Sequence, residues 1–166
     1  MGRTIPGRII ESKIFLIRGQ RVILDRDLAV LYGVGTKVLN QAVKRNIERF
    51  PHDFMFSLTR EEIMRMSQIV TSLKFSKNVN AFSEQGVAML SSVLGSKRAI
   101  QVNIAIMRAF VKLRRILTTQ KELIYKLKEL ESRLEEHDAD IHDIFEAIRQ
   151  LMGIPEARKI VKGFAH

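Results

Sequence analysis

The sequence predicts an α+β protein: a small mixed helical domain with short β-hairpins and a helix-turn-helix-like unit, followed by a long C-terminal coiled-coil helix. Two observations predict the first part. Short runs of β-branched and aromatic residues alternate with stretches bounded by capping residues and glycine, and 46% of the 166 residues are hydrophobic, which is enough for a packed core. The third observation is that residues 97–152 contain neither Gly nor Pro, so nothing there ends a helix.

The charge of the chain is strongly basic and unevenly distributed. Lys and Arg total 28 against 18 acidic residues, a net charge of +10. Residues 1–115 carry 20 basic and 8 acidic side chains (net +12), residues 116–152 carry 5 and 9 (net −4), and residues 153–166 carry 3 and 1 (net +2). Such asymmetry is typical of a nucleic-acid-facing domain joined to a segment with another role. We therefore predict a flexible tail over 1–8, a DNA-binding domain over 9–115, an oligomerisation helix over 116–152 and a basic tail over 153–166.

The chain opens with a predicted hairpin and a short helix. Residues 14–17 and 22–24 are β-prone runs separated by four residues that include a glycine, which indicates two paired strands. Asp25 can cap a helix that begins near Arg26. Gly33 can supply the left-handed conformation in which many helices end.

The next elements follow from capping residues and a proline. Thr36 can cap a second helix, which must stop before Pro51. Residues 54–58 (FMFSL) are predicted to form a strand. Thr59 and Glu62 have the spacing of a capping box, in which each side chain accepts a hydrogen bond from the other residue's backbone, so a helix should run from there to about Met66.

The remainder of the domain is predicted as two strands and further helices. Residues 69–82 resemble two strands around a polar turn at 76–78. Ser83 can cap the following helix, and Gly95 can end it. From Lys97 the sequence allows one long helix until Gly153, either continuous or interrupted near Thr118 and Thr119.

A heptad pattern runs along this last helix. Ten of twelve seam positions counted from Leu113 are apolar, which indicates a coiled coil that joins copies of the chain. The predicted oligomerisation residues are Leu113, Ile116, Leu123, Leu127, Leu130, Leu134, Ile141, Ile144, Ile148 and Leu151. The alternative is an amphipathic helix that folds back on its own chain.

The two helices around Gly33 have the pattern of a helix-turn-helix unit, with a small residue in the first helix and a glycine at the corner. The buried set would be Leu28, Ala29, Tyr32, Val34, Leu39 and Ala42. Amide and basic side chains on the second helix suit base edges and phosphates, although solvent also favours polar residues on an outer face. The predicted DNA-binding residues are Thr36, Lys37, Asn40, Gln41, Lys44, Arg45 and Arg49, with Lys74 and Lys77 as wing-like contacts.

Several segments together resemble the phage and bacterial ORF-six N-terminal domain family, a relative of the KilA-N and Bro-N domains. The resemblance runs through VILDRDLAVLYGVGTKVLNQAVKRNIERFPHDFMFSLTREE, SQIVTS and AFSEQGVAMLSSVLGSKRAIQVNIAIMRAFVKLR, or roughly residues 9 to 115. It implies a compact DNA-binding domain in a transcriptional regulator of phage or mobile-element origin. It supplies no catalytic residues. The alternative that it leaves open is an antirepressor-like module that captures another regulatory protein.

Other classes of function find little support in the sequence. The chain has no Cys, its four His residues lack metal-ligand spacing, and it has no carboxylate cluster suited to a nuclease. We therefore expect no metal, no cofactor and no enzymatic activity, and we interpret Ser83 and Glu84 as a helix start. No run is long and apolar enough to span a membrane, so we expect a cytoplasmic protein whose partners are double-stranded DNA and further copies of itself.

Overall fold

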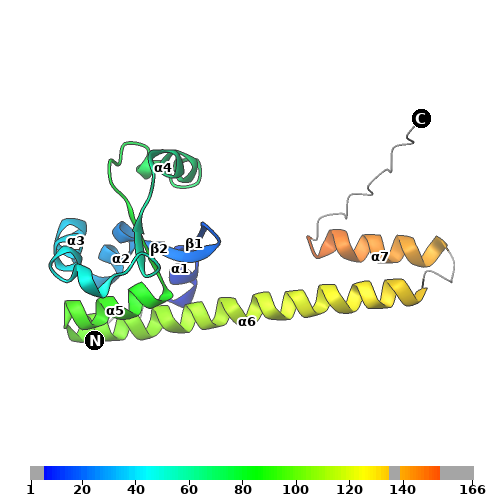
Figure 1. Ribbon diagram of the computed structural model, residues 1–166. Helices are drawn as coiled ribbons and strands as arrows, with labels where there is room; N and C mark the ends of the chain where they lie inside the picture. Colours follow the sequence, from blue (N-terminus) through cyan, green and yellow to red (C-terminus); the bar gives the residue numbers. More distant parts are fainter. Residues whose placement is uncertain (1–5, 135–138, 154–166) are drawn as a thin grey trace. The chain divides into compact units, whose positions relative to one another are not determined.

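The computed structural model describes residues 6–134 and 139–153 (Figure 1). The chain comprises two compact units, Met1–Arg115 and Ile116–His166, which we describe separately. The boundary lies where the net charge of the sequence changes sign.

A four-stranded antiparallel sheet with the order β1-β2-β4-β3 forms the centre of the first unit. Its strands are β1 (Ile14–Ile17), β2 (Gln20–Leu24), β3 (Met55–Ser57) and β4 (Asn80–Ser83). Arg18 and Gly19 connect β1 to β2 and both have positive φ, 52° and 72°, which matches the twist of a two-residue hairpin turn. The predicted hairpin and the predicted strand over 54–58 are therefore confirmed, and so is the mixed α+β class.

Helices precede, connect and follow the strands. They are α1 (Gly7–Glu11), α2 (Asp25–Tyr32), α3 (Thr36–Arg45), α4 (Arg60–Ser67), α5 (Glu84–Leu94), α6 (Lys97–Leu134) and α7 (Ala139–Leu151), with short 3₁₀ turns η1 (Ile47–Arg49) and η2 (Thr71–Leu73).

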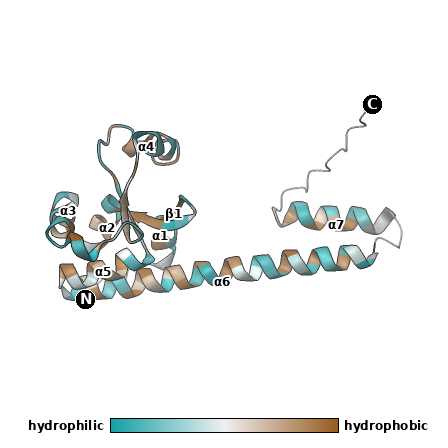
Figure 2. Cartoon of the chain, in the orientation of Figure 1, coloured by the Kyte–Doolittle hydropathy of each residue, from teal (hydrophilic) through white to brown (hydrophobic). Residues whose placement is uncertain are grey.

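Apolar side chains cover both faces of the sheet, because successive residues of a strand point to opposite sides. Ile23 packs in a cluster with residues of α1, α2, α3, α5 and α6. Its neighbours Val22 and Leu24 pack in a second cluster with α4 and η2. Figure 2 shows apolar residues along the strands and the helices around them. The core of the first unit therefore lies on both sides of β2 and β4.

Three predicted helix boundaries are confirmed. The capping box of Thr59 and Glu62 is present at the start of α4. Ser83 Oγ accepts a hydrogen bond from the Gly86 N–H at 3.3 Å, which caps α5. Gly33 ends α2 with φ 71°.

Two predicted caps are wrong. Asp25 is the first residue of α2 rather than its N-cap, and it is buried at 3% exposure, where its carboxylate accepts bonds from other parts of the fold. The N-cap of α3 is Gly35, and the Thr36 side chain makes no capping bond. A cap requires an extended backbone at the capping residue, and in both cases the helix begins one residue earlier than the sequence suggested.

The prediction of two strands over residues 69–82 is only half right. The second strand exists as β4, but the 3₁₀ turn η2 replaces the first. Val70 and Leu73 both turn toward the core, and Leu73 N–H donates to the Val70 carbonyl at 3.0 Å. A spacing of three between inward residues belongs to a helical turn, whereas a strand requires a spacing of two.

The long helix expected from Lys97 is confirmed as far as Leu134, where α6 ends, but it does not continue unbroken to Gly153, because α7 is a separate helix. An ion pair joins Arg149 of α7 to Glu131 of α6. On a continuous helix these residues would lie about 27 Å apart. Within the second unit, α7 therefore runs back beside the end of α6 (Figure 1).

Candidate nucleic-acid interface

A tight corner at Gly33 joins α2 to α3. The Val34 N–H donates to the Ala29 carbonyl at 3.0 Å, which closes the end of α2. Leu28, Ala29, Tyr32 and Leu39 are buried as predicted, and Val34 and Ala42 are half-buried. This is the arrangement expected of a helix-turn-helix unit.

The helix α3 separates an apolar inner side from a basic outer side. Leu39 and Val43 are 0% and 2% exposed and attach the helix to the core. Four of the predicted contact residues lie on the opposite side and are exposed: Lys37, Gln41, Lys44 and Arg45. Thr36 is also exposed, as the first residue of the helix, but its spacing of three and seven places it on the side of Leu39 and Val43. The helix contains no acidic residue. Its outer face therefore combines positive charge with an amide that can both donate and accept hydrogen bonds.

Asn40 is the exception among the predicted base readers. Its Nδ2 donates to Asp25 Oδ2 at 2.9 Å, and its Oδ1 accepts from Asn80 Nδ2 at 3.2 Å. The Asn80 N–H also donates to Asp25 Oδ2, at 3.3 Å. Both ends of the Asn40 amide are thus used inside the domain, where they hold α3 against the start of β4.

The remaining predicted contacts lie on other elements. Arg49 is in η1, and its Nη1 donates to Ser92 Oγ of α5 at 3.4 Å. Lys74 and Lys77 are exposed in the segment between η2 and β4. In the part of the chain that the structure describes, no strand pair presents these two lysines, so the predicted strand pair is wrong, and their contact with DNA stays a prediction.

Two residues of this surface were missed by sequence reasoning. Val38 is 55% exposed on the outer side of α3, where an apolar group can contact a thymine methyl. Arg98 of α6 lies against the corner, since a Cβ atom placed on Gly33 would come within 2.9 Å of its Nε. The spacing of exposed positions in α3 could have revealed Val38. Arg98 is distant in sequence from Gly33, so no local pattern indicates it.

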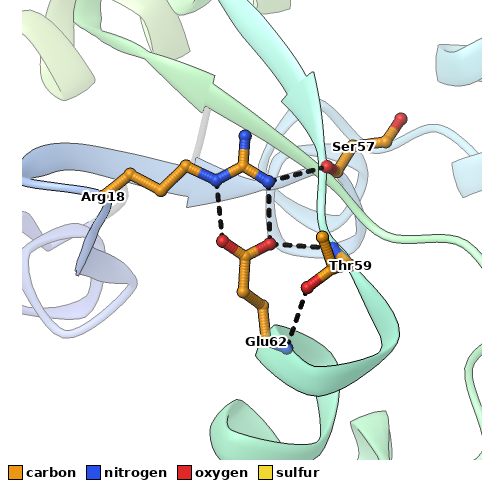
Figure 3. A network of polar contacts seen from close by, with 4 residues as sticks. All are labelled: Arg18, Ser57, Thr59 and Glu62. Carbon is orange, nitrogen blue, oxygen red and sulfur yellow. Dashed lines mark hydrogen bonds and ion pairs between the residues drawn. The ribbon is translucent and has the colours of Figure 1, made fainter.

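A polar network attaches α4 to the β1–β2 turn (Figure 3). Arg18 donates to Glu62 through Nε at 2.7 Å and Nη2 at 2.8 Å, and it stacks 4.4 Å from the centre of the Phe56 ring. The Thr59 N–H donates to the same carboxylate at 2.7 Å. These bonds favour the ionised carboxylate, chiefly the bond from Arg18, and they lower the pKa of Glu62 to about 2.

The second unit carries the predicted oligomerisation residues. Two of them, Leu127 and Ile148, are half-buried, and so is Leu113, which lies just before this unit. Most of the others remain exposed: Ile116, Leu123, Leu130, Ile144 and Leu151. The side chains of Leu134 and Ile141 lie outside the described residues.

Within the described ranges, 6–134 and 139–153, no group of three His, Cys, Asp or Glu side chains could hold a metal ion. No helix there is long and apolar enough to cross a membrane.

Comparison with known proteins identifies one similarity. Residues 12–93 match the family model of the ORF6N domain, which covers the sheet, the α2–α3 corner, α4 and nearly all of α5. No curated protein and no solved structure matches the chain.

Proposed function

Because residues 12–93 make this chain a member of the ORF6N domain family, we propose that it binds double-stranded DNA through the outer face of α3 and regulates transcription of phage or mobile-element genes. The family is not a known catalytic one, and the proposed role is binding. In this role α3 enters the major groove, where an α-helix fits and base edges are distinguishable.

The observation that carries this proposal is the contrast between the two sides of α3. The inner side is fixed by buried Leu39 and Val43 and by the bonds of Asn40 to Asp25 and Asn80. The outer side presents only neutral and basic groups. A helix held rigidly from behind can place its side chains with the accuracy that base recognition needs.

The outer residues divide into two expected roles. Gln41 can pair with adenine through both ends of its amide. Lys37 and Lys44 lie one turn to either side of it, and they would hold phosphates together with Arg45 and Arg98. Asn40 is assigned to positioning α3 rather than to reading bases.

The test is to select bound duplexes from a random library with the full chain and then to measure the affinity of variants across a salt series. Gln41→Ala should reduce the preference for the selected duplex by about 1–3 kcal/mol. Lys37→Ala with Lys44→Ala should instead weaken binding to selected and random duplexes alike. It should also reduce the slope of log affinity against log salt concentration by about two, one for each lost phosphate contact.

Matched controls lie elsewhere on the chain. Gln85→Ala removes an exposed glutamine of α5, and Lys121→Ala with Lys128→Ala removes two exposed lysines of the second unit. We expect Gln85→Ala to leave the preference for the selected duplex unchanged, and the control lysine pair to leave the affinity and its salt dependence unchanged. Failure of the full chain to enrich any duplex would contradict the proposal and would favour the antirepressor alternative.

We also propose that the exposed seam joins at least two copies of the chain. Leu123, Leu130 and Ile144 are 45%, 49% and 60% exposed, and a stripe of this kind favours a partner surface. Two linked domains could engage two half-sites and so gain affinity.

A further inference from the structure

The most exposed aromatic side chain among the described residues is Phe75, in the segment between η2 and β4. It is 87% exposed, so it contributes almost nothing to the core. We call residues 60–79, from α4 to the residue before β4, the α4–η2 lobe. Figure 1 shows this lobe standing out from the sheet.

Two arginines form hydrogen bonds with residues on either side of Phe75, Arg26 with side-chain hydroxyls and Arg60 with backbone carbonyls. Arg26 of α2 donates to Ser76 Oγ at 2.6 Å and to Ser72 Oγ at 3.1 Å. Arg60 of α4 donates to the carbonyls of Ser76 at 2.9 Å and Lys74 at 3.3 Å. These bonds hold the residues on both sides of Phe75, so the ring is presented on a braced segment rather than on a loose loop.

The surroundings of the ring are basic. Lys74 precedes Phe75 by one residue and Lys77 follows it by two, and the Lys74 Nζ lies over the ring, 5.9 Å from its centre. Neither lysine forms a salt bridge within the described ranges. The two carboxylates of the lobe are both used, because Glu61 pairs with Arg65 and Glu62 pairs with Arg18. An apolar ring between uncompensated lysines suits a polyanion that also offers an apolar surface, and the stacked bases of DNA have this combination.

The lobe is also tied to the proposed recognition helix. Asn80, at the start of β4, bonds to Asn40 of α3 at 3.2 Å. Phe75 precedes Asn80 by five residues, which can span at most about 18 Å. Half a turn of duplex DNA, the step from a major groove to the neighbouring minor groove, is about 17 Å. Phe75 therefore lies at most about one such step from the contact between Asn80 and α3, a separation that permits the ring to contact the next minor groove while α3 occupies the major groove.

We propose that Phe75 is an apolar wedge that enters the minor groove beside the site read by α3, with Lys74 and Lys77 on the flanking phosphates. Partial insertion of a side chain between base pairs unstacks them and bends the duplex toward the major groove, by about 20–90° in proteins that do this. This inference rests on the proposed DNA binding of α3. It adds a second contact and a change in the shape of the DNA.

The experiment uses the full chain and a duplex selected by it, with a fluorescence donor at one end and an acceptor at the other. Binding of the wild-type chain should bring the ends closer and raise energy transfer. Phe75→Ala should bind about tenfold more weakly and lose most of the rise in energy transfer at saturation. Phe75→Leu keeps an apolar wedge and should retain most of the rise.

The matched control is Leu16→Ala, which removes an exposed apolar side chain of β1, 72% exposed. It should change neither affinity nor energy transfer. Thermal unfolding of Phe75→Ala should equal that of the wild type, since the ring is outside the core. Equal affinity and equal energy transfer for Phe75→Ala and wild type would overturn the wedge, and would leave the lobe as a surface for a protein partner. If duplex preference still depends on Gln41 in that case, the proposed function stands and only the wedge fails.

Discussion

The two units of the chain differ in how far they bury their apolar side chains. Every buried apolar side chain of the described residues lies in the first unit, and the last of them is Phe110. In the second unit the described apolar residues are half-buried or exposed, up to 87% for Leu151. The first unit encloses its core, whereas the second leaves much of its apolar surface open.

The reason is the number of layers that each unit provides. A sheet has two faces, and in the first unit helices cover both of them. A pair of antiparallel helices shares only one contact line, so apolar residues outside that line stay open to solvent. The first unit therefore buries its apolar residues between its own layers, whereas the second leaves apolar residues that a further surface could cover.

The largest effect should come from damage to the enclosed core. Gly86→Ala places a Cβ where it would overlap the Phe54 carbonyl oxygen, a backbone atom that also accepts bonds from Ser83. Because a backbone atom cannot swing aside, we expect a loss of about 4 kcal/mol or more in the free energy of unfolding. Chemical denaturation followed by circular dichroism measures it.

Gly95→Ala is the matched control for this change. Gly95 has φ 55°, but a Cβ there would meet nothing within 4 Å. Only conformational strain is added, so the cost should be about 1 kcal/mol. Equal losses for the two variants would show that the stability of the first unit does not depend on the close approach of Gly86 to the Phe54 carbonyl.

The features that sequence reasoning recovered are those with local causes. The hairpin, the capping box at Thr59, the cap at Ser83 and the corner at Gly33 each depend on residues a few positions apart. The buried role of Asp25 escaped because its partners, Asn40 and Asn80, lie far along the chain. A short polar residue before a helix gives the same sequence signal in two cases: when its side chain caps the helix, and when it turns into the core and bonds to distant residues.

The same limit applies to the candidate site. The outer face of α3 follows from helical spacing, and the sequence therefore indicated Lys37, Gln41 and Lys44. The inward turn of Asn40, on the edge of that face, depends on tertiary contacts. Arg98 and the bracing of Phe75 by Arg26 and Arg60 are likewise contacts between separate elements, which periodicity cannot reveal.

Substitutions in the second unit should weaken association between chains and leave the stability of the first unit unchanged. Leu123→Asp with Leu130→Asp puts two charges into its exposed stripe. In an oligomer these charges would be buried without partners, so we expect association to weaken by about 3 kcal/mol or more, over a hundredfold. Light scattering should report a monomer, while the main unfolding transition of the first unit should be unchanged.

Tyr125→Asp with Ser132→Asp adds the same charge to exposed positions of α6 outside the seam and should leave association intact. A wild-type chain that is monomeric well above its working concentration would contradict the proposal of an open seam that recruits a second copy. The two units would then differ in how they pack their apolar residues, but the second unit would have no role in association.

The smallest effect should come from the ion pair between Arg18 and Glu62 on the surface of the first unit. The Arg18 guanidinium and the Thr59 N–H hold the pKa of Glu62 at about 2, below its ordinary value of 4.5. Above pH 4.5 both folded and unfolded chains carry the ionised group, and the stabilisation is fully present. As the pH falls from 4.5 toward 2 the unfolded chain takes up the proton first, so this part of the stability is progressively lost. Glu62→Gln should remove that slope and cost about 1 kcal/mol at neutral pH, as expected for a partly exposed pair. Denaturation across this pH range measures both quantities.

Glu61→Gln, which breaks only the exposed pair with Arg65, should keep the wild-type slope. An unaltered slope in Glu62→Gln would mean that other carboxylates govern the acid response, and that the apolar contacts of α4, through Ile63 and Met66, outweigh the polar network in attaching it to the sheet.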